Sequence, residues 1–273
     1  MMARRISWFL KSLVLVATLI TFGVLLFLIG YIMVKGLPYL SPALFAITYT
    51  SKNVSMMPSI VNTILMTLLA LLLAIPFGLF TAVYLAEYAS RGNRLVELIR
   101  LTAETLAGIP SIVYGLFGLL FFVTYLGWGF SILAGGATLS IMILPLIMRT
   151  TEEALKAVPD SFREASFGLG AGRLRTIFRI VLPAAVPGIL AGVILGIGRI
   201  VGETAALIYT AGTVAKLPEN LMSSGRTLSV HMYTLSSEGF HTNEAYATAV
   251  VLLIIVLVIN ALSASIAKKV AKG

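Results

Sequence analysis

The chain has 273 residues, of which 59% are hydrophobic and only 11% are charged. Soluble domains carry about a quarter charged residues, so this composition predicts an integral membrane protein. The formal net charge of +9 does not indicate a nucleic-acid partner, because in so apolar a chain the basic residues are distributed by membrane topology. The sequence contains no cysteine, which excludes a disulfide framework and a cysteine metal site.

Long runs without charged residues predict six membrane-spanning helices, because about 20 apolar residues are needed to cross a bilayer. The first run, residues 12–35, is too long for the apolar core of a secretory signal and is interpreted as a retained span. Residues 36–58 are rich in proline and predict a loop outside the membrane. The second span, residues 60–86, should bend at Pro76, since proline removes one intrahelical hydrogen bond.

The middle of the chain holds more apolar sequence than one span needs. Residues 91–104 mix arginines with glutamates and predict a loop with a helix lying at the membrane surface. A group of glycines after Leu126 marks a reversal, which divides the uncharged run into spans at 105–126 and 131–148.

The polar segment at residues 149–183 is too charged for lipid and is expected to lie in water. Ser161, followed three residues later by Glu164, has the pattern of a helix start at which these two residues cap each other. Apolar or small residues then recur at helical spacing on one face: Phe162, Ala165, Ser166 and Leu169. Three glycines predict a corner before a second short helix. The segment therefore predicts a pair of water-exposed helices over residues 160–180.

Two further spans are expected at 183–211 and 245–266, so that residues 1–273 form a single all-α transmembrane domain. Six spans place both termini on one side of the membrane. The positive-inside rule assigns that side to the cytoplasm. The basic residues counted on it are Arg4, Arg5, Lys11, Arg91, Arg94, Arg100, Arg149, Lys156, Arg163, Arg173, Arg175, Arg179, Lys268, Lys269 and Lys272. Those counted on the opposite side are Lys35, Lys52, Lys216 and Arg226.

Arg199 is the one basic residue well inside an apolar run. A charge at such depth costs about 3 kcal/mol even on insertion scales, so it needs a compensating reason. Glu203 follows four residues later, which on a continuous helix puts both side chains on one face. One interpretation is a structural ion pair. The other is that Arg199 faces an aqueous path and attracts an anion, while Glu203 holds the guanidinium and moderates its affinity.

Other polar residues give weaker signals. Arg149 ends the predicted fourth span, where an arginine ordinarily reaches toward the membrane surface. His231 and His241 lie in the polar loop before the last span and are interpreted as exposed loop residues rather than metal ligands. The sequence has no G-x-x-x-x-G-K-[ST] motif, so we expect this chain to be no enzyme and to bind neither metal nor cofactor itself.

Part of the polar segment follows a long, gapped motif, formed by Glu164, Ala165, Ser166, Gly170, Ile180, Leu182 and Pro183. This spacing resembles the E-A-A…G…I-x-L-P coupling loop of bacterial ABC importer permeases. Ser166 departs from the second alanine of that pattern but keeps its small size. The resemblance implies that the two helices dock on a separate ATPase subunit, which binds ATP and Mg²⁺, and transmit its movement to the membrane helices. Helix capping alone would also explain Glu164.

Three further segments carry a closer resemblance: G-I-P-S-I-V-Y-G-L-F at 108–117, L-P-L-I-M-R-T-T-E-E-A-L at 144–155 and G-R-I-V-G-E-T-A-A-L at 198–207. Together they resemble the PstA-type permeases of phosphate-specific ABC importers. The resemblance implies a six-helix, type I (MetI-like) importer fold. It implies a PstC-type second permease, two PstB-type ATPase subunits and a PstS-type phosphate-binding protein as partners. It makes four residues candidates for the translocation path: Arg199, Glu203, Arg149 and Thr204. Ala206 stands where relatives often have proline.

The expected function is therefore that of the transmembrane subunit of an ATP-driven phosphate importer in a bacterial or archaeal cytoplasmic membrane. A basic site identifies the charge of a ligand and not the ligand, so sulfate, molybdate or phosphonate is an alternative. An ATP-independent channel or secondary transporter is a second alternative, although the internal repeats common in secondary transporters are not evident. A phosphate-sensing role in the same assembly also stays open.

Overall fold

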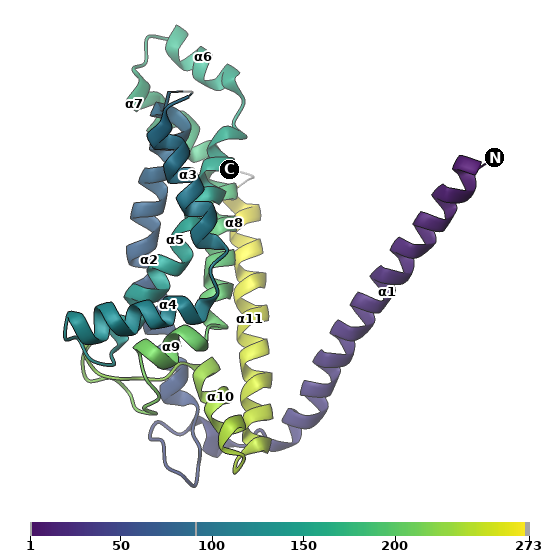
Figure 1. The fold of residues 1–273 in the computed structure, drawn as a ribbon, viewed down its shortest axis with the longest axis vertical. Helices are drawn as coiled ribbons and strands as arrows, with labels where there is room; N and C mark the ends of the chain where they lie inside the picture. Colours follow the sequence, from purple (N-terminus) through teal and green to yellow (C-terminus); the bar gives the residue numbers. More distant parts are fainter. Residues whose placement is uncertain (1, 91, 271–273) are drawn as a thin grey trace.

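The computed structural model describes residues 2–90 and 92–270, and every regular element in these ranges is helical (Figure 1). Arg91 and Lys272, counted above as basic residues, lie outside the described residues. The side chains of Arg4, Arg5, Lys268 and Lys269 lie outside the description too.

Five helices are long: α1 (Met2–Gly36), α2 (Met57–Val83), α5 (Ile132–Lys156), α8 (Leu182–Val201) and α11 (Thr242–Val270). Shorter helices are α3 (Arg94–Ala107), α4 (Ser111–Gly118), α6 (Asp160–Gly168), α7 (Arg173–Thr176), α9 (Ala205–Thr210) and α10 (Leu228–Glu238). Two 3₁₀ turns, η1 (Leu37–Tyr39) and η2 (Pro42–Phe45), follow α1. Three π-helical turns extend longer helices: η3 (Tyr84–Tyr88), η4 (Leu119–Tyr125) and η5 (Ile177–Val181).

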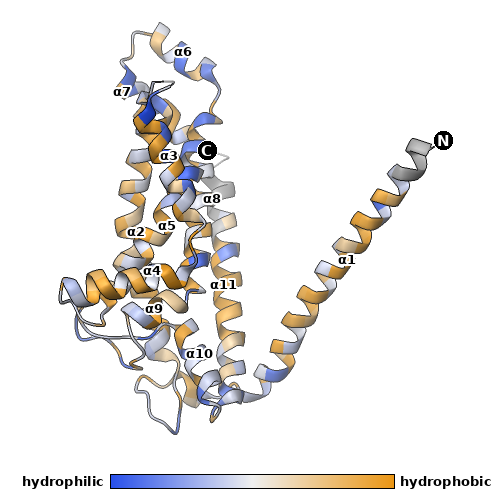
Figure 2. Cartoon of the chain, viewed as in Figure 1, coloured by the Kyte–Doolittle hydropathy of each residue, from blue (hydrophilic) through white to orange (hydrophobic). Residues whose placement is uncertain are grey.

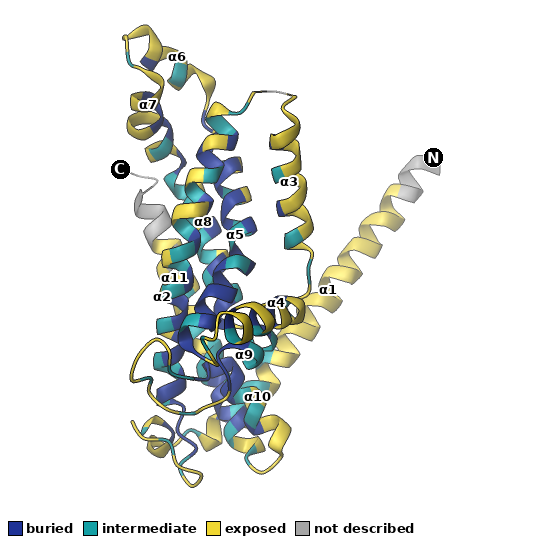
Figure 3. Cartoon of the chain, turned by 60° about the vertical axis from the view of Figure 1, so that its left-hand side comes forward, coloured by how far each residue is buried: buried dark blue, intermediate teal, exposed yellow. Residues whose placement is uncertain are grey.

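The bundle is built around α5. In its most apolar stretch 72% of the residues are buried, against none in α1, and the buried surface is concentrated on α5 and the helix faces turned toward it (Figure 3). Small residues let the helices approach closely. A Cβ on Gly78 of α2 would lie 2.9 Å from Ile147, and one on Gly192 of α8 would overlap Thr150. Close backbone approach of this kind is how helices associate where lipid offers no hydrophobic driving force.

Helix α1 leaves the bundle (Figure 1). Near its carboxyl end it meets α11, where Tyr31 packs edge-on against Tyr246 at 5.9 Å between ring centroids. Beyond that contact α1 diverges (Figure 1). It is largely apolar (Figure 2), and its side chains are mostly exposed (Figure 3). A bilayer would cover such a surface.

The helices α6 and α7 form a polar hairpin at one end of the molecule, which we call the hairpin end (Figure 2). Helix α1 begins toward this end and α11 finishes toward it (Figure 1). The loops between α9 and α10 and between η2 and α2 lie at the opposite end.

The expectation of one continuous helix at 105–126 is wrong. The structure has α3 followed by α4 and η4, with a bend of 102° between the two halves. The cause lies at Gly108 and Pro110: proline cannot donate a helical hydrogen bond and disfavours helical geometry in the residue before it. The helix expected within 91–104 exists as α3, but its orientation is not the expected one. It stands alongside α5 instead of lying flat at the membrane surface (Figure 3). Hydropathy shows that this part of the chain is apolar enough to lie in a membrane, but it does not show where the helix bends.

The packing of α4 on α9 gives a stability prediction. A Cβ on Gly115 would lie 2.8 Å from the backbone Cα of Ala206, so the two helices would have to separate. We expect Gly115→Ala to lower the free energy of unfolding by about 1–3 kcal/mol, as overpacking does elsewhere. Gly23→Ala is the matched control, since no atom lies within 4 Å of its Cβ position. Thermal unfolding in detergent measures both, and equal midpoints would contradict the packing.

Candidate functional site

The hairpin has the predicted corner but not the predicted cap. Helix α6 ends at Gly168 and α7 begins at Arg173, and between them Gly170 adopts φ +80°, a conformation that favours glycine. Helix α6 begins at Asp160, with Pro159 at the N-cap and no side-chain hydrogen bond there. Ser161 therefore lies inside the first turn. The mutual cap of Ser161 and Glu164 is wrong, because the N-cap is Pro159, two residues before Ser161.

An open cleft of about 540 Å³ lies between the two arms of the hairpin. It is lined by Phe162, Ala165, Ser166, Leu169, Gly170, Ala171, Arg175, Arg179 and Ile180. The four residues expected to share a face of α6 all contribute to it. At its base the hydroxyl oxygens of Ser166 and Thr176 lie 2.8 Å apart and join the two arms. No described residue covers the cleft, so the hairpin presents apolar side chains with an arginine rim to its surroundings.

The motif residues differ in exposure. Glu164, Ala165, Gly170 and Pro183 are exposed, as is Ile180, while Leu182 is half-buried and Ser166 is buried. The exposed carboxylate of Glu164 makes no ion pair within the described chain. Ser166 is thus the one buried residue of the motif, and its hydroxyl group joins the two arms of the hairpin.

The base of the hairpin holds a buried ion pair that sequence reasoning missed. Arg163 of α6 donates from Nη2 to Oε1 of Glu87 in η3 at 2.7 Å. The same guanidinium donates to the carbonyl oxygens of Val158 at 2.8 Å and Leu155 at 2.9 Å. The hydrogen bond to Glu87 raises the pKa of Arg163 above its ordinary value. The only sequence signal is an acidic residue at the end of a predicted span.

Arg199 and Glu203 do not form the expected ion pair. Helix α8 ends at Val201, so the four-residue spacing no longer places the two side chains on one face. Arg199 lies half-exposed in the last turn of α8, and no ion pair of the described residues involves it. Glu203 is buried and turns to α9, where its Oε1 accepts a hydrogen bond from the backbone N–H of Ala206 at 3.1 Å. The expected continuous helix at 183–211 is thus broken after Gly202.

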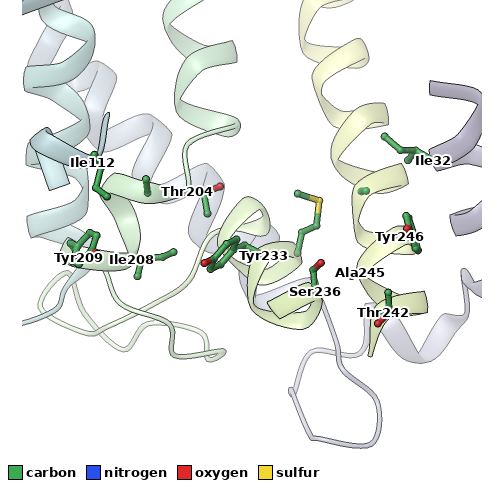
Figure 4. A pocket seen from close by; sticks show the side chains of 13 residues that line it. Ile32, Ile112, Thr204, Ile208, Tyr209, Tyr233, Ser236, Thr242, Ala245 and Tyr246 are labelled. Atoms are coloured by element: carbon green, nitrogen blue, oxygen red, sulfur yellow. The ribbon is translucent and has the colours of Figure 1, made fainter. Parts of the chain in front are cut away.

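Thr204 lines the cavity shown in Figure 4. The cavity measures about 650 Å³ and lies between α4, α9, α10, α11 and the end of α1. Its polar lining is made of hydroxyl groups from Thr204, Tyr209, Tyr233 and Ser236 among others. The break after α8 therefore places Thr204 at a space large enough for a small solute, with hydroxyl groups on several helices.

Arg149 lies apart from this cavity, exposed on α5. Its Nη1 is 3.9 Å from Oε1 of Glu104, and the two side chains are 47% and 68% exposed. An exposed pair at that separation contributes little to stability.

His231 is not the exposed loop residue expected from the sequence. Thr227 caps helix α10, and His231 is fully buried on it, edge-on to Tyr49 at 6.2 Å. Arg226, also buried, lies over the same ring at 4.8 Å. Burial and the positive charge of Arg226 lower the pKa of His231 to about 3. The segment was expected to be a loop because its composition is polar, but it contains helix α10. His241 is half-exposed, with Nδ1 3.8 Å from Oε2 of Glu244.

Comparisons with known proteins agree with this architecture. Residues 74–273 match the family described as "Binding-protein-dependent transport system inner membrane component". The "Probable ABC transporter permease protein YqgI" of Bacillus subtilis (strain 168) is 35% identical over 257 residues, covering 87% of each chain. The "Phosphate transport system permease protein PstA" of Yersinia pestis is 34% identical over 263 residues, covering 92% of this chain and 87% of that one.

A solved bacterial alginate ABC transporter in complex with a periplasmic protein contains a chain of the same fold. It superposes with a TM-score of 0.71 at 18% identity, covering 97% of this chain and 96% of that chain. Fold and hairpin together define the permease of a type I ABC importer. The chain belongs to the family of binding-protein-dependent transport system inner membrane components and, within it, to the PstA type.

The burial of His231 predicts a pH dependence of stability. Its pKa is about 3 when folded, against 6.5 for the ordinary group, so the unfolded chain takes up the proton first as the pH falls. The stability contributed by the neutral ring is fully present above pH 6.5 and is lost between pH 6.5 and 3. The measurement is the free energy of unfolding as a function of pH. We expect His231→Gln to flatten this curve between pH 6.5 and 3 and His241→Gln to leave it unchanged. Parallel profiles for the His231 variant and the wild type would contradict the assignment.

Proposed function

We propose that this chain is the transmembrane permease subunit of an ATP-driven importer of inorganic phosphate. The observation that carries the proposal is the 34% identity to a PstA phosphate transport permease over 92% of the chain. The Bacillus subtilis relative, which aligns with 87% of this chain, is named only as a probable ABC transporter permease. Sulfate, molybdate and phosphonate are therefore the alternatives against which phosphate is to be tested.

Arg199 is the proposed anion-attracting group. A guanidinium without a carboxylate partner in an apolar bundle favours a bound oxyanion, because its planar fork matches two oxygen atoms. Glu203 does not neutralise it in this arrangement, and its hydrogen bond to α9 instead fixes the break that ends α8. Thr204 supplies a hydroxyl group at the neighbouring cavity. Arg149, exposed on α5, is the second candidate for the path of the anion.

The hairpin is the proposed docking element. We place the hairpin end, with both termini, in the cytoplasm, because most basic residues lie on that side. There the cleft between α6 and α7 would dock on a PstB-type subunit that binds ATP and Mg²⁺. A homologous PstC-type permease and a PstS-type phosphate-binding protein complete the proposed complex, which carries two ATPase subunits. In the proposed alternating access, ATP closes the ATPase subunits, the hairpin follows, and the bundle turns its cavity outward to receive phosphate. Return to the inward state releases it. Membership of an importer family argues against an ATP-independent channel or secondary transporter, and co-purification with an ATPase tests this point.

The role of Arg199 is tested by Arg199→Gln in vesicles that contain the assembled complex. A hydrogen bond to a charged group contributes about 1.5–3 kcal/mol, so we expect uptake of labelled phosphate to fall by roughly tenfold or more. Lys52→Gln, in an exposed loop at the opposite end, is the matched charge control.

The identity of the anion is tested on the wild type, by adding unlabelled sulfate, molybdate or phosphonate in competition with labelled phosphate. Full uptake by an assembled Arg199 variant would refute the site, and stronger competition by another oxyanion would refute phosphate.

The hairpin corner gives a second test. Gly170 has φ +80°, which a β-branched residue adopts only with strain, so Gly170→Val should distort the corner without touching the membrane helices. We expect ATP hydrolysis to continue while phosphate uptake falls by about tenfold, within the usual range of coupling free energies. Gly30→Val on exposed α1 is the control, because no atom lies within 4 Å of its Cβ position. An unchanged ratio of uptake to hydrolysis would count against docking through this hairpin.

A further inference from the structure

Three arginines from three different elements hold the π-helical end of α2. Arg100 of α3 donates from Nη2 to the carbonyl oxygen of Leu85 at 3.3 Å. Arg163 of α6 binds the carboxylate of Glu87, and Arg173 of α7 donates to the carbonyl oxygen of Glu87. The guanidinium of Arg173 also lies 4.7 Å above the ring of Tyr88. Both arms of the hairpin therefore bind the same residue, Glu87.

The chemistry of a helix end explains this arrangement. The last carbonyl groups of a helix have no intrahelical partner, and the helix dipole makes that end negative. Arginine carries five donors in a rigid fork and can bind carbonyl and carboxylate oxygens together. The turn η3 thus offers two carbonyl oxygens and one carboxylate to three guanidinium groups.

The contact through Arg163 is shielded from water and reaches a second helix. The side chains of Glu87 and Arg163 are 8% and 16% exposed, whereas Asp160, which also pairs with Arg163, is 86% exposed. The bonds from Arg163 to the carbonyl oxygens of Leu155 and Val158 join it to the end of α5 and the turn after it. One side chain of α6 therefore holds the ends of both α2 and α5.

We propose that the Glu87–Arg163 pair is the joint through which movement of the hairpin enters α2. The inference rests on the function proposed above. The chain itself links the hairpin to α5 through residues 157–159 and to α8 through η5, and neither link reaches α2. The ion pair gives α2 a direct connection to α6, so the three core helices move together with the hairpin. Glu87 and Arg163 are positioning residues in this scheme, since they touch neither the solute nor ATP.

The test measures phosphate transported per ATP hydrolysed by the complete complex in lipid vesicles. Glu87→Gln keeps the shape of the side chain and removes its charge. We expect the transport ratio to fall by about tenfold while ATP hydrolysis continues, within the range typical of coupling between two sites. Glu153→Gln is the matched control: Glu153 is exposed on α5 and forms no ion pair among the described residues. A purely structural pair would lower transport and ATP hydrolysis of the assembled complex equally, and that result overturns the inference.

A second variant keeps the inference testable if Glu87→Gln does not assemble. Glu87→Cys combined with Arg163→Cys removes both charges, which is tolerated better than leaving one buried charge unpaired. The native chain has no cysteine, so a flexible bis-maleimide of suitable length can bridge only these two positions within it. We expect the double variant to have a low transport ratio before bridging and a recovered ratio after it. The bis-maleimide should not change the ratio of either single-cysteine variant.

The outcomes separate this inference from the function on which it rests. A wild-type complex that moves no labelled phosphate on ATP hydrolysis would refute the proposed function. A coupled wild type whose ratio survives Glu87→Gln, or whose bridged double variant shows no recovery, would refute the joint alone.

Discussion

The structure depends on how the carboxyl end of α2 is satisfied. A helix that ends near a membrane surface leaves carbonyl groups that need donors, and here arginines of α3 and α7 supply them. The arginine of α6 binds the carboxylate of Glu87 in the same turn. Each of these contacts fixes the position of its own element relative to one turn of five residues. A buried ion pair such as Glu87–Arg163 is weak evidence for net stability, because desolvation offsets much of the attraction. Its effect is to specify one geometry, in which the hairpin is attached to α2 and α5.

The same principle governs the break after α8. Irregular backbone at membrane depth is tolerated where it lines a cavity and its polar groups find partners inside the protein. The carboxylate of Glu203 accepts from α9 and its carbonyl oxygen accepts from the hydroxyl of Ser229, so the break is held on both sides. Among the described residues no carboxylate forms an ion pair with Arg199 at the end of α8. Broken helices of this kind are where transporters commonly form solute sites.

The sequence predicts those features that depend on local pattern. Apolar length located the long helices, and glycine at 170 located the hairpin corner, since only local backbone freedom was at issue. The shared face of Phe162 and Leu169 was correct for the same reason. The Arg199–Glu203 pair was not, because helical spacing assumes a helix that continues, and α8 ends between the two residues. The burial of His231 was missed because it depends on Tyr49, far away along the chain.

The Glu87–Arg163 pair shows what separates topology from structure. The positive-inside rule uses Arg100, Arg163 and Arg173 only to orient the chain, and it assigns them no partner. In the structure α2 and α5 are among the helices that end at the hairpin end and direct negative dipoles toward it. Basic residues placed there by topology are therefore also placed where helix ends need cations and donors. The partners lie 76 residues apart in the case of Arg163, so no periodicity in the sequence connects them. The arginines that the positive-inside rule uses to orient the chain are thus the same side chains that hold the end of α2.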